Sequence, residues 1–414
     1  MRDGAIVQVL GRRVWDSRGR PTVEAEVHLA GGAVGRAIAP AGASTGSGEA
    51  VDLRDGGARF GGFDVRQAVS HVLNDINVAL TGVDALDQGA VDAALIDLDG
   101  TANKGRLGGN AMIAVSMAAA HAGAQAVRQP LWRWLSNGGK AQMPRPMIQI
   151  FGGGAHAGKR VDVQDFMITT PGASSFVEAL NWTADVYRTA GALMAEAGRL
   201  HGVADEGGYW PEFASNEEAL VMLTRAIERA GYQAPDQVGI ALDIAASQFG
   251  RGGRYRFGLD GRELDRDGLA DLLVAWTTHY PIVSIEDPFA EDDSQGFIAL
   301  MNAVGDRIQI VGDDLLVTNA RRIDRAVSIG ACNAALIKPN QAGTLTETRA
   351  AFDAARAAGW HTIISARSGE SEDTTIVHLA VGWNAGQLKV GSFSRSERMA
   401  KWNEGIRIEE ALAR

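Results

Sequence analysis

The stretch Ile282-Val283-Ser284-Ile285-Glu286-Asp287-Pro288 decides how the rest of the chain is interpreted. Its first four residues are mostly apolar and partly β-branched, which is typical of a strand buried on both faces of a parallel sheet. Two carboxylates end the strand, and Pro288 prevents it from continuing. Because α/β barrels carry their chemistry at the carboxyl ends of their strands, the stretch predicts one strand of a barrel with a charged mouth.

Five further apolar stretches end in charged residues in the same way. Their ends are Asp243, Asp313-Asp314, Lys338, Arg367 and Lys389, and successive ends lie 22 to 43 residues apart when Glu286 is included. A strand followed by a helix takes about 30 residues, and helical patterns such as that of 344–358 fill the intervals. The longest interval contains 250–263, whose alternation predicts an inserted hairpin. Six such units predict a parallel barrel, and no GxGxxG motif supports the competing doubly wound sheet.

The first third of the chain has a different pattern. Runs within 5–38 alternate apolar and polar residues, as half-buried antiparallel strands do, and residues 65–135 show helical periodicity. The stretch 97–101 is typical of a helix start. These patterns predict an α+β domain over residues 1–138, followed by an α/β barrel over 139–414. The glycine-rich loop 40–48 is either a flexible connector or a mobile lid, and the sequence alone favours the connector.

Composition and charge exclude several classes of function. The chain has 414 residues, of which 46% are hydrophobic, and its net charge of −10 argues against binding to nucleic acid or to an anionic membrane. The most apolar run, 111–127, is interrupted by Ser116 and His121, so it predicts a buried helix and not a membrane span. Cys332 is the only cysteine, which fits a reducing compartment, and the N-terminus resembles no signal peptide. We therefore expect a cytoplasmic protein.

Three consecutive strand ends carry the carboxylates Asp243, Glu286 and Asp313. In a closed barrel these ends converge, and three carboxylates without counter-charge raise one another's pKa in a dry site. Mg²⁺, a hard cation that prefers carboxylate and water oxygens, would offset their repulsion. Separate salt bridges to neighbouring Arg or Lys residues are the simpler alternative, but three acids on successive strands favour a metal site.

The next three strand ends carry the cations Lys338, Arg367 and Lys389. An arginine offers a bidentate fork to phosphate or carboxylate, so this half of the mouth suits an anionic substrate. A lysine close to a metal ion and to other cations has a lowered pKa and can act as a base, although the pattern does not decide which lysine does so. Asp165 and Glu206, across the mouth, are candidates for the complementary acid.

Motifs in the same order along nearly the whole chain resemble those of the enolase family. They are Asp16-Ser17-Arg18-Gly19, Gly42-Ala43-Ser44-Thr45-Gly46, Gly153-Gly154-Ala155-His156, Asp205-Glu206-Gly207-Gly208, Ser284-Ile285-Glu286-Asp287, Gly312-Asp313-Asp314, Leu336-Ile337-Lys338-Pro339-Asn340-Gln341 and Arg367-Ser368-Gly369-Glu370. The resemblance implies an enolase-type (β/α)8 barrel with an N-terminal α+β capping domain. It also implies a Mg²⁺-dependent hydro-lyase that assembles as a homodimer or an octamer.

The resemblance further implies roles for single residues. Lys338 would remove the proton α to the substrate carboxylate, and Glu206, positioned with Asp165, would help the β-hydroxyl leave. Asp243, Glu286 and Asp313 would hold the Mg²⁺ that stabilises the enediolate, and Ser44 would ligate a second Mg²⁺. His156 and Gln164 would contact the substrate, Arg367 and Ser368 would bind its phosphate, and Lys389 would bind its carboxylate. The product would be an enol phosphate such as phosphoenolpyruvate.

Several residues depart from the family pattern. Ala366 stands where the family usually has a histidine, Asp165 stands where it usually has a glutamate, and Lys159-Arg160 replace part of a lid that usually carries Asp-Asn-Asn. The lost volume and the added charge of Lys159 and Arg160 lead to the hypothesis of a bulkier, more anionic analogue of 2-phosphoglycerate. A family relative of this type, carboxyphosphonoenolpyruvate synthase, dehydrates 2-phosphonoformylglycerate to carboxyphosphonoenolpyruvate.

Three alternatives remain at the level of sequence. The first is an ordinary enolase that converts 2-phospho-D-glycerate to phosphoenolpyruvate. The second is a non-catalytic enolase-like binding protein, which the retained base and metal ligands disfavour. The third is racemisation of an acid sugar, which would need a second base where this chain has Glu206 and Asp165.

Overall fold

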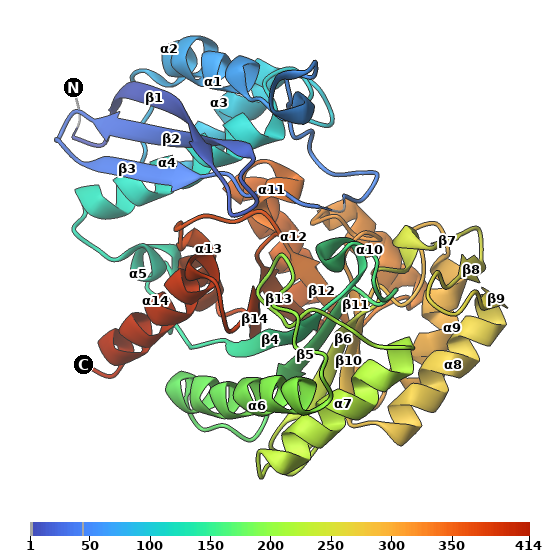
Figure 1. Ribbon diagram of the computed structural model, residues 1–414. Helices are drawn as coiled ribbons and strands as arrows, with labels where there is room; N and C mark the ends of the chain where they lie inside the picture. Colours follow the sequence, from blue (N-terminus) through green and yellow to red (C-terminus); the bar gives the residue numbers. More distant parts are fainter. Residues whose placement is uncertain (1–2, 44) are drawn as a thin grey trace.

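The computed structural model describes residues 3–43 and 45–414, which form an N-terminal α+β domain and a closed barrel. The first domain opens with the antiparallel sheet β1–β2–β3, whose strands are Ile6–Trp15, Pro21–Leu29 and Val34–Ile38. Its helices are α1 (Arg66–His71), η2 (Val72–Ile76), α2 (Asn77–Leu80), α3 (Gln88–Asp99), α4 (Gly109–Ala126) and α5 (Leu131–Leu135), with the short turn η1 at Arg59–Gly62. Figure 1 shows this domain above the barrel, with α4 beneath the sheet.

Helix α4 is the buried helix that the apolar run 111–127 predicts. Most of its side chains are alanine or other small residues, and nearly all are buried. The helix packs against β2 and β3 on one side and contacts α11 of the barrel on the other, so it joins the two domains. No helix in the described part of the chain is both long and apolar enough to cross a membrane.

The prediction of a helix start at 97–101 is wrong, because this stretch ends a helix. Helix α3 stops at Asp99, and Gly100 follows in the left-handed conformation with φ 67°. A glycine of this kind commonly terminates helices because it adopts positive φ without steric cost. The Asp99 carboxylate accepts hydrogen bonds from the backbone N–H groups of Thr101, Arg106 and Leu107, so it organises the loop that follows.

The second domain is the predicted barrel. Its eight strands are hydrogen-bonded in the order β10-β11-β12-β13-β14-β4-β5-β6, and the ring closes between β6 and β10. Their bounds are β4 Arg145–Gly152, β5 Asp165–Thr169, β6 Gly239–Asp243, β10 Ile282–Glu286, β11 Gln309–Gly312, β12 Ala334–Ile337, β13 His361–Ser365 and β14 Gln387–Ser392. The closed ring excludes the doubly wound open sheet.

One strand differs from an all-parallel barrel. Strand β5 pairs antiparallel with both β4 and β6, whereas the other neighbours are parallel. The physical reason is the connection: only the loop 153–164, with the one-turn helix η3 (Gly154–Ala157), joins β4 to β5, and a parallel pair needs a longer crossover. The reversal brings the first residue of β5, Asp165, opposite Asp243, the last residue of β6. Asp165 therefore lies at the mouth.

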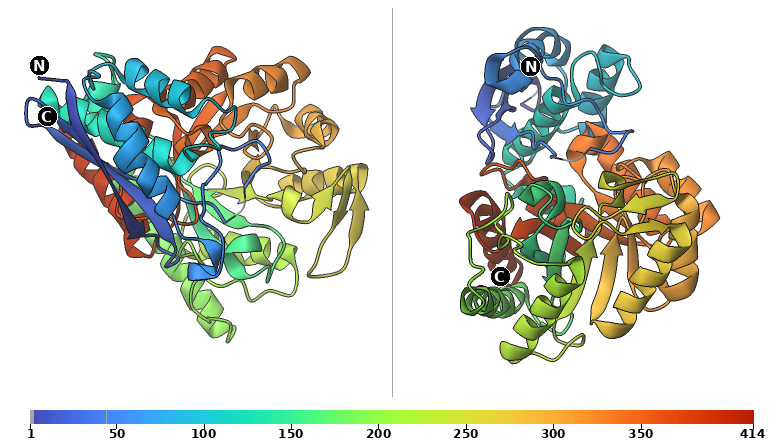
Figure 2. Two further views of the ribbon diagram at one scale, coloured as in Figure 1. Left: turned by 90° about the horizontal axis from the view of Figure 1, so that it is seen from above. Right: turned by 45° about the vertical axis from the view of Figure 1, so that its right-hand side comes forward.

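Helices surround the barrel, as Figures 1 and 2 show. They are α6 (Phe176–Glu196), α7 (Asn216–Arg229), α8 (Arg266–His279), α9 (Ser294–Val304), α10 (Ala320–Ile329), α11 (Pro339–Ala342), α12 (Leu345–Ala357), α13 (Thr375–Gly382) and α14 (Ser396–Leu412). The predicted hairpin insertion is the small sheet of β7 (Gly250–Arg251), β8 (Arg254–Arg256) and β9 (Glu263–Asp265), which follows the turn η4 (Ala246–Gln248).

A small apolar cluster fills the barrel interior. Its side chains come from β4, β5, β6, β11, β12 and β13, and they are Met147, Met167, Ala241, Val311, Ala334, Leu336 and Ile363. Each is almost fully buried. Such interior layers make a barrel a packed core and not a pore, so the polar side chains at the strand ends stand on a rigid floor.

Candidate active site

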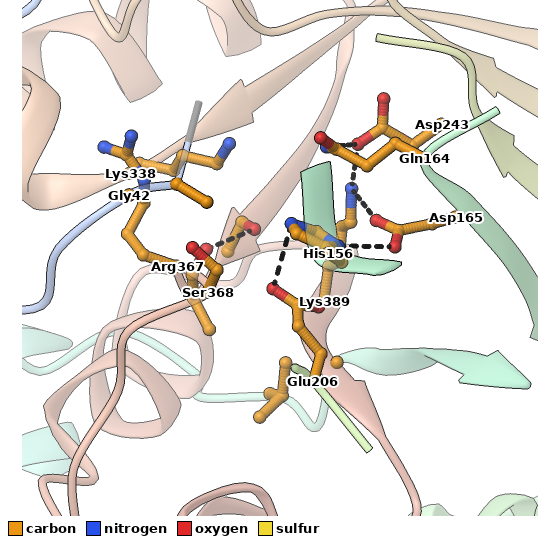
Figure 3. A pocket seen from close by; sticks show the side chains of 15 residues that line it. Gly42, His156, Gln164, Asp165, Glu206, Asp243, Lys338, Arg367, Ser368 and Lys389 are labelled. Atoms are coloured by element: carbon orange, nitrogen blue, oxygen red, sulfur yellow. Dashed lines mark hydrogen bonds and ion pairs between the residues drawn. The ribbon is translucent and has the colours of Figure 1, made fainter. Parts of the chain in front are cut away.

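A polar cavity opens at the mouth of the barrel, below the N-terminal domain. Its volume is about 20 Å³, and Figure 3 shows the side chains that line it. They come from the loop after β3, the loop between β4 and β5, the start of β5, the loop between α6 and α7, the ends of β6, β12 and β13, and β14 itself. The lining residues are Gly42, Ala43, His156, Gln164, Asp165, Glu206, Asp243, Lys338, Ser365, Ala366, Arg367, Ser368, Lys389, Val390 and Gly391. Most of the residues that the sequence singles out thus meet in one place.

The carboxylates Asp243, Glu286 and Asp313, called the acidic half below, are all buried at the ends of β6, β10 and β11. The Lys389 ammonium lies 2.8 Å from Asp243 Oδ2 and 2.7 Å from Glu286 Oε2, and it lies 3.4 Å from Asp165 Oδ2. Burial lowers the pKa of Lys389, but the three carboxylates outweigh burial and raise it well above its usual value. Burial and the nearby Asp243 raise the pKa of Glu286.

Lys338 lies beside the third carboxylate. Its Nζ is 2.5 Å from Asp313 Oδ2, and Gln341 Nε2 donates to Asp313 Oδ1 over 2.8 Å. Burial lowers the pKa of Lys338, but Asp313 raises it by more, so the net shift is upward. The same ammonium holds the pKa of Asp313 below its usual value although burial acts in the opposite direction. Each group therefore stabilises the charged form of the other.

The acidic half retains carboxylate oxygens that a hard cation could use, although its three acids are not among the groups whose ligand atoms all lie within 4.8 Å of one another. Glu286 Oε1 is buried without a hydrogen-bond partner, and no hydrogen bond to Asp243 Oδ1 occurs within 3–43 and 45–414. Carboxylate oxygens without donors are the ligands that Mg²⁺ prefers. In this structure the ammonium groups of Lys338 and Lys389 lie among the three acids and offset their charge. Ligand atoms of two other groups lie within 4.8 Å of one another, Asp287–Asp313–Asp314 and His156–Asp165–Glu206.

Asp287 positions the loop after β11. Its Oδ1 accepts a hydrogen bond from Asp313 N over 2.9 Å, and its Oδ2 accepts one from Asp314 N over 2.8 Å. Burial and the neighbouring Asp314 raise the pKa of Asp287 well above its usual value. Of the two carboxylates that end β10, Glu286 faces the site and Asp287 fixes the backbone next to it.

Glu206, His156 and Asp165 form the opposite wall. His156 Nδ1 lies 3.1 Å from Asp165 Oδ1 and His156 Nε2 lies 3.8 Å from Glu206 Oε1, as Figure 3 shows. Gln149 Nε2 also donates to Asp165 Oδ1. Burial raises the pKa of Glu206. Burial acts in the same direction on Asp165, but His156 and Lys389 outweigh it and lower the pKa of Asp165. The pKa values of two neighbouring carboxyl groups are thus shifted in opposite directions: that of Glu206 upward and that of Asp165 downward.

The residues Ala366, Arg367 and Ser368, called the β13 loop below, form a third wall. The Arg367 guanidinium contacts Glu49 at 2.8 Å and Asn340 Oδ1 at 3.1 Å, and Arg18 donates to Ser368 Oγ over 3.2 Å. The Ala366 side chain faces the cavity with only 7% of its surface exposed. Small apolar and cationic groups therefore line the same wall.

Glu49 is a functional candidate that the sequence analysis missed. It lies three residues beyond Gly46, whose N–H its Oε1 accepts over 2.9 Å, and it reaches the β13 loop from the N-terminal domain. The sequence did contain a signal for Glu49: it is a carboxylate that directly follows a glycine-rich loop with several hydroxyl side chains. The ion pair between Glu49 and Arg367 links the end of the glycine-rich loop to the β13 loop. A mobile lid would break and re-form this pair, whereas a simple connector would not depend on it.

Two predicted site residues, Lys159 and Arg160, lie away from the cavity. Lys159 is exposed, Arg160 pairs with Glu212 at 2.6 Å, and neither lines the cavity. In this conformation the lid charge that the sequence predicts for the mouth is partly offset by Glu212. Ser44, the predicted ligand of a second Mg²⁺, lies outside the described residues.

Comparisons with known proteins agree with this architecture. The family model described as "Enolase, N-terminal domain" matches residues 6–135, and the model described as "Enolase, C-terminal TIM barrel domain" matches residues 140–414. A curated protein named "Enolase" from Rubrobacter xylanophilus is 49% identical over 408 residues, which cover 98% of this chain and 95% of that protein.

Proposed function

The chain belongs to the enolase family and is a hydro-lyase of the enolase type, and we propose that it eliminates water from a 2-phosphoglycerate-like acid that is larger and more anionic than 2-phosphoglycerate itself. The arrangement of a base and an acid on opposite walls of one cavity supports the elimination. The small side chain of Ala366 supports the larger substrate.

Lys338 is the proposed base. The C–H bond α to the substrate carboxylate breaks, its proton goes to Lys338 Nζ, and its electron pair forms the new double bond to the β-carbon. Lys338 must be neutral to accept this proton, whereas Asp313 favours its charged form here. A cation that shared Asp313 would remove that bias, so the base and the metal site are coupled.

Glu206 is the proposed acid. As the carbon–oxygen bond at the β-carbon breaks, Glu206 donates a proton and the hydroxyl leaves as water. Burial raises the pKa of Glu206, which favours the protonated form that an acid catalyst needs. Asp165 and His156 hold this wall in place through their 3.1 Å contact.

The remaining polar residues have proposed roles in binding. Asp243, Glu286 and Asp313 would hold Mg²⁺, and Ser44 a second one with substrate. When bound, Mg²⁺ supplies positive charge that offsets the charge developing on the substrate carboxylate. Lys389 would bind that carboxylate, Arg367 and Ser368 would bind the phosphate or phosphonate, and Gln164 would contact the substrate beside them.

The single observation that carries the larger substrate is Ala366 on the β13 loop. A methyl group there is smaller than the imidazole usual in the family, and an additional anionic group of the substrate would use that volume and lie against the Arg367 guanidinium. Lys159 and Arg160 would add charge only if the loop 153–164 rearranged, because Arg160 pairs with Glu212 in this structure. The substrate proposed is 2-phosphonoformylglycerate, and the product is carboxyphosphonoenolpyruvate.

A second candidate substrate is 2-phospho-D-glycerate, with phosphoenolpyruvate as the product. The 49% identity to a protein named "Enolase" favours it. We also expect the protein to be cytoplasmic and to form a homodimer or an octamer. Light scattering of the purified protein would test the oligomeric state.

The deciding experiment compares the two substrates with the purified protein and Mg²⁺, by the absorbance of the newly formed enol. We expect kcat/KM for 2-phosphonoformylglycerate to exceed that for 2-phosphoglycerate by at least about tenfold, the usual discrimination from a change in pocket size. Preference for 2-phosphoglycerate would identify an ordinary enolase. Binding of both compounds without exchange of the α-proton would instead identify a non-catalytic member of the family.

A further inference from the structure

Gln248 lies behind the cavity wall and takes no part in the roles described so far. It ends the turn η4, which directly follows the strand that carries Asp243. Its side-chain amide lies between the η3 turn, which carries His156, and Gln164. Gln248 therefore touches two segments that reach the substrate without lining the cavity itself.

The hydrogen bonds of Gln248 have a fixed direction. The backbone N–H of Ala155 donates to Gln248 Oε1 over 3.0 Å, and a backbone N–H can only donate. The Oε1 atom of Gln248 must therefore face Ala155, which turns its Nε2 toward Gln164 Oε1. Gln164 Nε2 consequently faces Asp243 and donates to its Oδ2 over 2.9 Å.

The acceptor at Asp243 requires the same orientation of both amides as the donor at Ala155 does. A carboxylate oxygen such as Asp243 Oδ2 only accepts, so it requires an N–H from Gln164. The backbone of Gln164 is held independently, because its N–H donates to the carbonyl of Asp243 over 2.9 Å and its carbonyl accepts from Gly153 N over 2.7 Å. The freedom that remains to Gln164 is the orientation of its amide.

The η3 turn packs closely against Gln164 and Gln248. Gly154 has a positive φ of 47°, and a Cβ atom there would lie 3.1 Å from both Gln164 Cα and Gln248 Oε1. This conformation and this close approach favour glycine. The turn, Gln248 and Gln164 therefore form one packed unit.

We infer that Gln248 is a positioning residue that sets the orientation of the Gln164 amide and thereby determines which oxygen of Asp243 is free. Asp243 Oδ2 accepts from both Gln164 and Lys389, which leaves Oδ1 for a cation. This inference rests on the metal site of the proposed function, but it does not depend on the identity of the substrate.

A glutamate at position 248 would reverse the sequence of donors and acceptors. In Gln248→Glu the carboxylate can accept from Ala155 N but cannot donate to Gln164 Oε1. The Gln164 amide would turn over and place its oxygen against Asp243 Oδ2. We expect Mg²⁺ affinity, measured by calorimetry at about pH 8.5 without substrate, to fall about tenfold, the low end of the effect of residues that orient metal ligands.

A pH series separates polarity from packing. When the introduced carboxylate of Gln248→Glu becomes protonated it regains a donor, so the ratio of variant to parent kcat/KM should recover as the pH falls from about 8.5 to about 5.5, with burial raising the pKa of the new carboxyl. In Gln248→Met, which keeps the shape without donor or acceptor, we expect a loss of about threefold that is independent of pH. Gln67→Glu on the exposed face of α1 is the control for the change in charge.

The outcomes decide the inference. A Gln248→Glu variant that binds Mg²⁺ as tightly as the parent overturns the inference. An equal, pH-independent loss of kcat/KM in Gln248→Glu and Gln248→Met also overturns it, because it would show an effect of packing alone. Because calorimetry needs no substrate, a parent enzyme that binds Mg²⁺ but turns over neither candidate substrate would refute the proposed reaction and leave this test intact. Circular dichroism spectra of the variants would show that they fold.

Discussion

The acidic half and the β13 loop lie on the same cavity but differ in how their charges are balanced. In the acidic half, each carboxylate is held by a lysine on another strand of the same barrel, at distances of 2.5 to 2.8 Å. In the β13 loop, Arg367 is held by Glu49, which belongs to the other domain, and its neighbour Ala366 contributes no polar contact from its side chain.

The difference separates two tasks. The acidic half is fixed by strands that stand on the packed barrel floor, so its geometry is rigid, as the proposed abstraction of an α-proton requires. The β13 loop depends on a partner across the domain boundary, and its smallest side chain faces the cavity. We infer that the acidic half determines the type of reaction and that the β13 loop determines the substrate.

The largest effect is expected from removing Lys338, the proposed base beside the acidic half. Lys338→Met should lower kcat about 10³-fold or more, because general base catalysis typically contributes 10²- to 10⁴-fold. Exchange of the substrate α-proton with deuterium, followed by NMR, should stop as well. The exposed Lys140→Met variant is the control. Continued exchange in Lys338→Met would assign the base to another residue and end the division of tasks proposed above.

The next largest effect is expected from Glu206→Gln on the opposite wall. This substitution should lower activity but raise stability at high pH. Glu206→Gln cannot donate a proton, so kcat should fall about 10²-fold. The pKa of Glu206 is raised in the folded state, so the folded protein holds this proton more tightly than the unfolded chain does. Glu206 therefore lowers the free energy of unfolding progressively as the pH rises from about 4.3, the pKa in the unfolded chain, through the pKa in the folded protein.

The variant should therefore be more stable than the parent above that range and equal to it at lower pH. Thermal unfolding at several pH values would measure this, with the exposed Glu228→Gln as the control. A variant that is less stable than the parent at high pH would contradict the raised pKa.

The β13 loop should change selectivity and leave the type of reaction intact. In Ala366→His the imidazole would fill the space beside Arg367, so the ratio of kcat/KM between the larger substrate and 2-phosphoglycerate should fall about tenfold. The exposed Ala357→His variant in α12 is the control. An unchanged ratio would remove the volume argument, and a total loss of activity with both substrates would show that the β13 loop also serves the chemistry.

The smallest effect is expected from the lid. Arg160→Gln breaks a pair with Glu212 in which both side chains are about one-third exposed, and such pairs contribute roughly 0–1 kcal/mol. We expect KM to change less than about threefold. Arg229→Gln, which breaks the similar pair with Glu196 away from the mouth, is the matched control. A much larger rise in KM for Arg160→Gln alone would bring the lid charge back into substrate binding.

The sequence predicted the features that depend on local pattern. The charged residues at or just after the ends of β6, β10, β11, β12 and β13 were visible because strand periodicity and the residue after the strand are both local. The strand end predicted at Lys389 was wrong, because β14 continues to Ser392. The reversed direction of β5 was not, because strand direction depends on the length of the connection and on the neighbours that close the ring. The helix start at 97–101 was wrong because an aspartate before a glycine fits either end of a helix.

Contacts between distant residues were also hidden. Glu49 and Arg367 are separated by 318 residues, and no periodicity relates them. The acids of the acidic half were predicted to need a cation, but the sequence did not show that Lys389 would lie between Asp243 and Glu286. The position of a side chain within a charge network depends on all the charges together, which a pattern along one strand does not contain.

The reversed strand β5 also has a consequence for the order in which the site assembles. His156 and Asp165 are 9 residues apart, and Gln149 and Asp165 are 16 apart, so short loops close these contacts at low entropic cost. Lys389 is 146 residues from Asp243 and 103 from Glu286, so those contacts form only when the ring of strands closes. Until that moment the acids at the ends of β6 and β10 lack the counter-charge of Lys389, and ring closure is the folding step at which their repulsion is relieved.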